Sequence, residues 1–72
     1  MKIEGFKEVY DIRWETYKKE YEMFTLYVNR HINSPEGLFT ATVHDIDDSA
    51  HEIYLKDNVD ENWIREFDKL MQ

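Results

Sequence analysis

Two histidines and several acidic residues lie close together near residue 48, and groups of this kind can bind a divalent metal ion. The stretch runs His44-Asp45-Ile46-Asp47-Asp48, and His51-Glu52 follows. Imidazole and carboxylate groups are common metal ligands, but the spacing matches neither the His-Glu-x-x-His motif nor the calcium-binding loop. We therefore interpret the stretch as a solvated turn, in which aspartates hydrogen-bond to the backbone. A small metal- or ligand-binding domain that uses His44 and His51 is the alternative.

The serines and glycines give no support for an enzyme. The two serines, Ser34 and Ser49, lie in predicted turns, and neither is part of the Gly-x-Ser-x-Gly motif that exposes a nucleophile. Two glycines are too few for a glycine-rich loop that binds phosphate. The chain has no cysteine, which excludes disulfides and cysteine zinc sites. We expect no enzymatic activity and no cofactor.

The chain is acidic, and its charge is unevenly distributed. It has 72 residues and a net charge of −7, with −1 in residues 1–36 and −6 in residues 37–72. Binding to phosphate backbones requires clustered lysine and arginine, so we expect no direct nucleic-acid binding. No apolar run approaches the ~20 residues that span a bilayer, and charges interrupt the start of the sequence. We therefore expect a cytoplasmic protein whose acidic half attracts a basic partner surface.

Aromatic residues number eleven, or 15 % of the chain, which is high for its length. One short helix covers only one face of a sheet, so some of these side chains are expected on a second face. Tyrosine and tryptophan are enriched at interface centres. Tyr10, Trp14, Tyr27 and Tyr54 are the candidates for a face that binds a partner or a second copy. In the alternative interpretation, the segment with Ile3 and Phe6 folds over the rest of the chain.

Three segments have the alternating pattern of β-strands. Residues 23–29 place Phe24, Leu26 and Val28 on one face. Residues 38–46 and 52–56 are predicted to form a hairpin around residues 47–49. A three-residue loop sets Val43 opposite Ile53 and Ala41 opposite Leu55, which joins the apolar faces of the two strands.

Residues 6–21 permit two interpretations. Tyr10, Ile12, Trp14 and Thr16 alternate with charged residues, as in a half-buried strand, but aromatic residues also recur at helical spacing. We favour the strand because β-branched and aromatic residues are frequent in it. The adjacent lysines at positions 18 and 19 are then expected at the tip of the following turn.

The last segment is predicted to be a helix. Trp63, Ile64, Phe67 and Leu70 form one apolar stripe, and Asn58 or Asp57 is expected to cap the first turn. The sequence therefore predicts a single α+β domain over residues 1–72, with a four-stranded antiparallel sheet and a C-terminal helix packed on one face. An α-β-β-β-α order is the alternative.

These observations predict a non-catalytic protein-interaction module. In one version, the aromatic sheet face forms a homodimer. In the other, acidic residues of the hairpin and helix dock on a basic partner surface: Asp45, Asp47, Asp48, Asp57, Asp60 and Glu61. Small acidic inhibitors from phages and mobile elements act in this manner, an analogy of class only.

Overall fold

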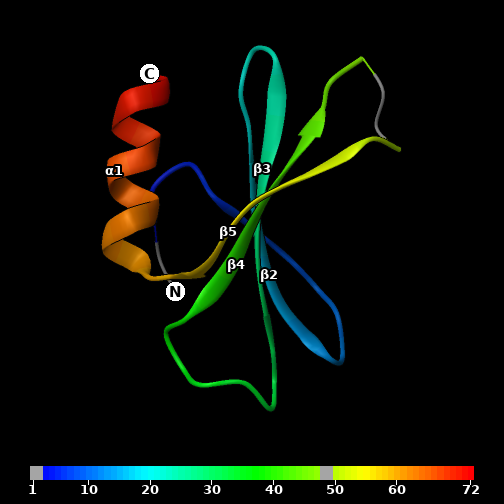
Figure 1. Ribbon diagram of the computed structural model, residues 1–72, viewed down its shortest axis with the longest axis vertical. Coiled ribbons are helices and arrows are strands. Elements are labelled where there is room, and N and C mark those ends of the chain that lie inside the picture. The colour runs from blue at the N-terminus through cyan, green and yellow to red at the C-terminus, as the bar shows by residue number, and fades with distance from the viewer. Residues whose placement is uncertain (1–2, 48–49) are drawn as a thin grey trace.

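The computed structural model describes residues 3–47 and 50–72 and contains a five-stranded antiparallel sheet with one α-helix (Figure 1). The strands follow one another across the sheet in chain order. Their bounds are β1 (Lys7–Val9), β2 (Trp14–Glu20), β3 (Phe24–His31), β4 (Phe39–Asp45) and β5 (Glu52–Val59), and α1 spans Glu61–Met71. The α+β class and the antiparallel sheet are confirmed, whereas the predicted number of strands is one too few.

The missing strand is β1, which pairs with β2 so that Val9 lies opposite Thr16. Residues 6–21 are therefore not helical, but the strand within them begins at Trp14 and not at Tyr10. Tyr10 lies between β1 and β2, in a turn in which the Asp11 carboxylate accepts a hydrogen bond from the backbone N–H of Arg13 at 2.8 Å. The side-chain hydrogen bond favours a turn at this point over continuation of the strand.

The predicted lysine turn is also wrong, because Lys18 and Lys19 lie inside β2. Lys19 points toward the helix, and its Nζ atom donates to Asp68 Oδ1 at 2.6 Å. The same oxygen accepts a hydrogen bond from the Tyr21 hydroxyl at 2.7 Å. Burial acts to raise the pKa of Asp68, but the hydrogen bonds from Lys19 and Tyr21 outweigh it, so the pKa lies below its ordinary value.

The hairpin of β4 and β5 has the predicted register only near its turn. Val43 pairs with Ile53 as expected, but Ala41 pairs with Lys56 and not with Leu55. The register shifts twice along this pair of strands. Extra residues in one strand of a pair increase its twist and bend, and the apolar alternation alone does not reveal them.

The N-cap of the helix lies two to three residues after the predicted caps. Asp60 is the N-cap, and its carboxylate accepts a hydrogen bond from the backbone N–H of Trp63 at 2.8 Å. Asp57 is instead held by the hydroxyl of Thr40 at 2.9 Å. Asn58 has a φ of 56°, in the left-handed region that asparagine tolerates better than most residues.

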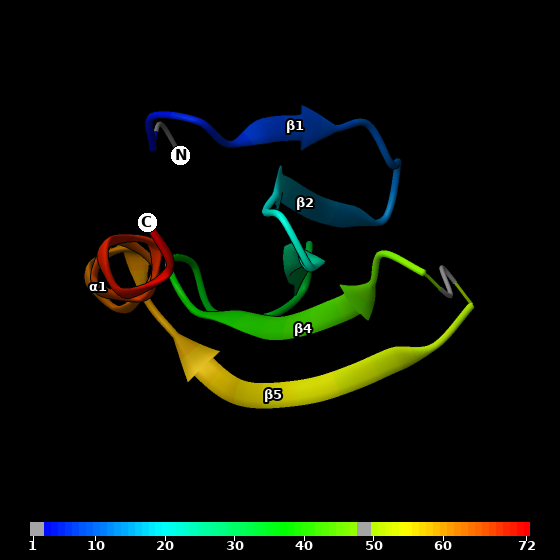
Figure 2. The same ribbon diagram turned by 90° about the horizontal axis from the view of Figure 1, so that it is seen from above.

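The core lies between α1 and one face of the sheet, which we call the covered face (Figure 2). At its centre, Leu26, Val28, Ala41 and Ile64 have no exposed surface. Ile3 is also buried, so the segment before β1 covers part of this face. Three residues expected in the core are substantially exposed: Ile53 and Leu55, which lie on the edge strand β5, and Leu70, which lies near the end of α1.

Candidate functional site: the open sheet face

The sheet face opposite the core is here called the open face. Directly paired residues of neighbouring strands point to the same face, so the register defines its members. They are Lys7 and Val9 of β1, Trp14, Thr16, Lys18 and Glu20 of β2, Thr25, Tyr27, Asn29 and His31 of β3, Thr40, Thr42 and His44 of β4, and Glu52, Tyr54 and Asp57 of β5.

Three of the four aromatic residues singled out in the sequence lie on the open face. Trp14 is 45 % exposed and Tyr54 58 % exposed. Trp14 contacts the ring of His31 edge-on at 5.1 Å, and Tyr27 contacts His44 at 4.5 Å between ring centroids. Their common face follows from the two-residue period of the strands.

Tyr10, the fourth candidate, is not on the open face. It lies in the turn after β1 and is 88 % exposed. It lines a hollow at the end of the sheet together with Trp14 and Ile32. The apolar surface around Trp14 therefore continues from the open face onto this end of the molecule.

A hollow of about 450 Å³ lies on the open face between Trp14 and Tyr54, and Asn29, Thr40, Thr42 and Glu52 complete its lining. Thr42 is 5 % exposed, and its hydroxyl has no hydrogen-bond partner among the residues that the structure describes. Buried polar groups are nearly always paired. The hydroxyl of Thr42 is thus a polar group that the described chain leaves unsatisfied.

The outer side of the hollow is formed by a small hydrogen-bonded group. The Asp57 carboxylate accepts a hydrogen bond from Thr40, and its hydrogen bond with the Tyr54 hydroxyl raises the pKa of that tyrosine. A carboxylate that accepts from two hydroxyls is held in one orientation. Asp57 therefore presents its negative charge at a fixed place on the β5 side of the open face.

Two lysines lie on the other side of the open face. Lys7 of β1 is directly opposite Lys18 of β2, and like charges at directly opposite positions of a sheet are unfavourable. Glu20 lies 3.8 Å from Lys18. Within the described residues, no carboxylate lies within ion-pair distance of Lys7. The β1 side of the open face is therefore positive and the β5 side negative.

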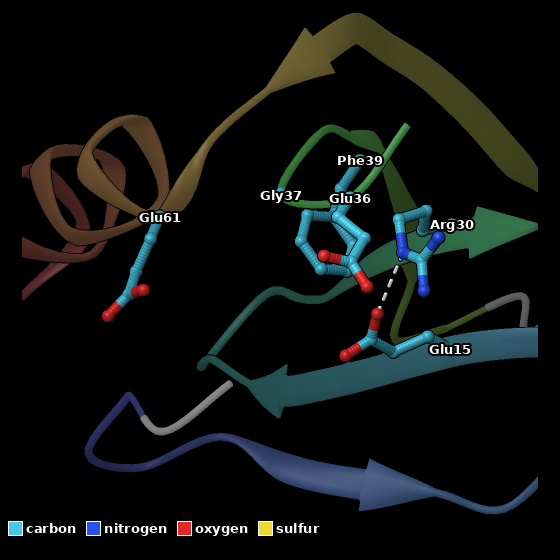
Figure 3. Close-up of a pocket in the computed structure, with 6 residues that line it drawn as sticks. All are labelled: Glu15, Arg30, Glu36, Gly37, Phe39 and Glu61. Atoms are coloured by element: carbon cyan, nitrogen blue, oxygen red, sulfur yellow. Dashed lines mark hydrogen bonds and ion pairs between the residues drawn. The ribbon is translucent and has the colours of Figure 1, made fainter. Parts of the chain in front are cut away.

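A second pocket, of about 300 Å³, lies on the covered side near the start of α1 (Figure 3). Its lining consists of Glu15, Arg30, Glu36, Gly37, Phe39 and Glu61. Arg30 donates to Glu15 at 2.8 Å, and the Tyr17 hydroxyl donates to the same carboxylate at 2.6 Å.

These two hydrogen bonds pair the Glu15 carboxylate with Tyr17 and Arg30 inside the second pocket. The hydrogen bond from Tyr17 and the pairing with Arg30 lower the pKa of Glu15, and burial together with Glu15 raises the pKa of Tyr17 to about 12. The carboxylates of Glu36 and Glu61 border the remaining space (Figure 3). Glu61 is also paired with Arg65 along the helix.

The acidic residues predicted to dock on a partner do not form one patch. Asp45 and Asp47 lie at the turn between β4 and β5, whereas Asp60 and Glu61 lie at the start of α1. Figures 1 and 2 place this turn and the helix on opposite sides of the molecule. Asp48 lies outside the described residues.

The two histidines considered as metal ligands are in different surroundings. His44 lies on β4, 3.8 Å from Glu52, and His51 precedes β5 in the turn. In residues 3–47 and 50–72, no group of three His, Asp or Glu side chains could hold a metal ion.

Sequence reasoning missed two polar features of the open face, Thr42 and the pair Lys7–Lys18, and it named Asp57 only as a helix cap and as an acidic docking residue. The alternation of threonines with Phe39, Ala41 and Val43 would have placed Thr42 opposite the core. The lysine pair could not have been found, because β1 was not recognised as a strand.

No helix in the described part of the chain has the length and apolar character needed to cross a lipid bilayer. Comparison of the chain with protein-family models, with curated proteins and with solved structures finds no match.

Proposed function

We propose that this protein is a non-catalytic interaction module that binds another protein through the open face. The observation that carries the proposal is the exposure of Trp14 and Tyr54 around a hollow on a sheet face that no described element covers. Tryptophan and tyrosine are the residues that most often dominate binding energy at interface centres. The unsatisfied hydroxyl of Thr42 lies in the same hollow.

The charge of the open face supports this proposal. Its two lysines and three carboxylates give a net charge of −1, although the whole chain carries −7. Charged residues are depleted at the cores of interfaces. The open face is thus weakly charged for a surface of so acidic a protein, and an inhibitor that occupies a partner's surface would use such a face.

Site-specific photo-crosslinking in the native host tests the proposal. A photoreactive amino acid at position 54 should form a covalent protein adduct, whereas the same group at position 70 should not. Leu70 is the matched control because it is 77 % exposed and lies on α1, beyond the covered face. Absence of adducts at position 54, or equal adducts at both positions, would contradict binding at the open face.

A pair of substitutions adds a second readout. Trp14→Ala should reduce the adduct at position 54 about tenfold or more, since losing an interface anchor commonly costs over 1.4 kcal/mol of binding free energy. Leu70→Ala should leave the adduct unchanged. Circular dichroism checks that both variants are folded. Undiminished crosslinking in folded Trp14→Ala would count against the proposal.

The second pocket supports a second candidate function, docking on a basic partner. Glu36 and Glu61 border a space that would accept a lysine or arginine side chain, with Phe39 in its lining. A photoreactive group at position 36 distinguishes the two candidates. Adducts at position 36 that disappear at high salt, with none at position 54, would favour this second function.

A further inference from the structure

We propose that the partner of the open face is a second copy of this chain, and that two sheets stack face to face in a homodimer. This inference rests on the proposed function, because it names the occupant of the same face. It is argued from the arrangement of charge, from the lysine pair and from the position of Thr42.

The charged side chains of the open face lie toward opposite edges of the sheet. Lys7 and Lys18 lie on β1 and β2, where Glu20 offsets one of the two positive charges, whereas Glu52 and Asp57 lie on β5. β3 runs between the two groups, at the centre of the strand order. Seen from the partner's side, the face is positive along one edge and negative along the other.

This arrangement is complementary to itself under one twofold axis. An axis parallel to β3 and between two stacked sheets places β1 of one copy over β5 of the other. Each lysine edge then faces a carboxylate edge. An in-plane axis perpendicular to the strands would instead place β1 over β1, lysines against lysines, so the charges favour the first arrangement.

The dimer accounts for the unfavourable lysine pair. Lys7 lies opposite Lys18, and within the described part of the chain it has no ion partner. In the proposed arrangement, Lys7 extends toward Glu52 and Asp57 of the second copy. Stacked sheets lie about 10 Å apart, a separation that two facing side chains of this length bridge together.

The same arrangement places a lysine over Thr42. Lys18, Tyr27, Thr42 and Tyr54 form one row across the sheet, because each is paired with the next. The axis parallel to β3 keeps each row at its own level and places β2 over β4. Lys18 of one copy therefore lies over Thr42 of the other, above the hydroxyl that the described chain leaves unsatisfied.

Sedimentation equilibrium tests the dimer with the wild-type chain. We expect concentration-dependent dimers that are populated at about 100 µM, and we expect Trp14→Ala to raise the dissociation constant at least tenfold, whereas Leu70→Ala leaves it unchanged. A wild-type chain that is strictly monomeric at this concentration overturns the second-copy inference.

Charge reversal tests the arrangement of the two copies. The double variant Lys7→Glu/Lys18→Glu makes both edges negative, and Glu52→Lys/Asp57→Lys makes both edges positive. Each should be monomeric alone, and an equimolar mixture should form a heterodimer. If circular dichroism shows that this second variant is unfolded, Glu52→Lys alone replaces it. The single change leaves the hydrogen bonds of Asp57 intact, makes the β5 edge neutral, and should weaken the homodimer without abolishing it.

The outcomes separate this inference from the proposed function. Homodimers that persist in both charge-reversed variants, or a mixture that stays monomeric, would overturn the proposed arrangement. A monomeric wild-type chain that still forms adducts at position 54 with a different protein would overturn the second copy and leave the proposed function standing. Failure of the proposed function would appear as no adduct at position 54.

Discussion

The two faces of this sheet share the same backbone ladder but differ in how their polar groups are satisfied. On the covered face, Lys19 and Asp68 are part-buried and paired at 2.6 Å. On the open face, the hydroxyl of Thr42 is buried with no partner among the described residues, and Lys7 faces Lys18. The covered face is complete within one chain, whereas under the proposal made above the open face is completed by a partner.

The largest expected effect compares two neighbours on β3. Leu26, on the covered face, has no exposed surface, and Leu26→Ala should lower the free energy of unfolding by roughly 3 kcal/mol because it leaves a cavity. Tyr27→Ala, on the open face, should lower it by about 1 kcal/mol or less in the monomer. Urea denaturation at low protein concentration measures both. Equal losses would mean that the open face is packed as tightly as the core.

Asp68→Asn sharpens the comparison by weakening the polar contact of the covered face. It should lower the free energy of unfolding by about 2 kcal/mol, because the Lys19 ammonium group loses its buried counter-charge. Since the folded pKa of Asp68 lies below its ordinary value of 3.8, its contribution is full above that pH and is lost as the pH falls through the folded pKa.

The stability of wild-type protein should therefore fall more steeply below pH 3.8 than that of Asp68→Asn. Glu66→Gln is the matched control, since Glu66 lies on the same helix with its side chain 62 % exposed and is only loosely paired with Lys69 at 3.7 Å. If Asp68→Asn and Glu66→Gln had the same acid unfolding curve, the contact would not stabilise the covered face.

A smaller effect is expected at the start of the helix that covers the core. Asp60→Ala removes the acceptor of the hydrogen bond from the backbone N–H of Trp63, and it should lower the free energy of unfolding by about 1 kcal/mol. Asp60→Asn keeps a capping side chain and should cost much less. Thermal unfolding compares the two, and an equally large loss in both would show that charge at this helix end matters more than the cap.

The smallest expected effect is a gain in stability, whereas the other substitutions are expected to lower it. Thr42→Val removes an unsatisfied hydroxyl with little change in shape, and should raise the free energy of unfolding of the monomer by up to about 1 kcal/mol. It should also weaken association through the open face. Thr40→Val is the control, because Thr40 donates to Asp57 and its loss should destabilise the chain. A Thr42→Val variant with unchanged association would show that this hydroxyl contacts no partner.

The features that depend on local alternation could be predicted from the sequence. The period of two placed Trp14, Tyr27 and Tyr54 on one face, and the helical period found α1. The pairing of Val43 with Ile53 followed from the joining of apolar faces. Each of these depends on residues within one element or one hairpin.

Features that depend on distant or competing partners could not be predicted. Lys19 and Asp68 would each be predicted as surface residues from the sequence. Burial of either charge becomes favourable only when the two are paired, and they lie 49 positions apart in the chain. The N-cap was wrong because Thr40 holds Asp57, and that contact requires the register of β4 and β5. β1 has three residues, too few for a pattern.

The separation of Lys19 from Asp68 along the chain has a consequence for synthesis. All five strands leave the ribosome before the helix, so the nascent sheet has neither its covered face nor its buried ion pair closed. During that interval Leu26 and Val28 lack the cover of the helix, and such transient apolar surface is prone to aggregate. The arrival of α1 with Asp68 covers one of the two apolar faces and leaves only the open face exposed.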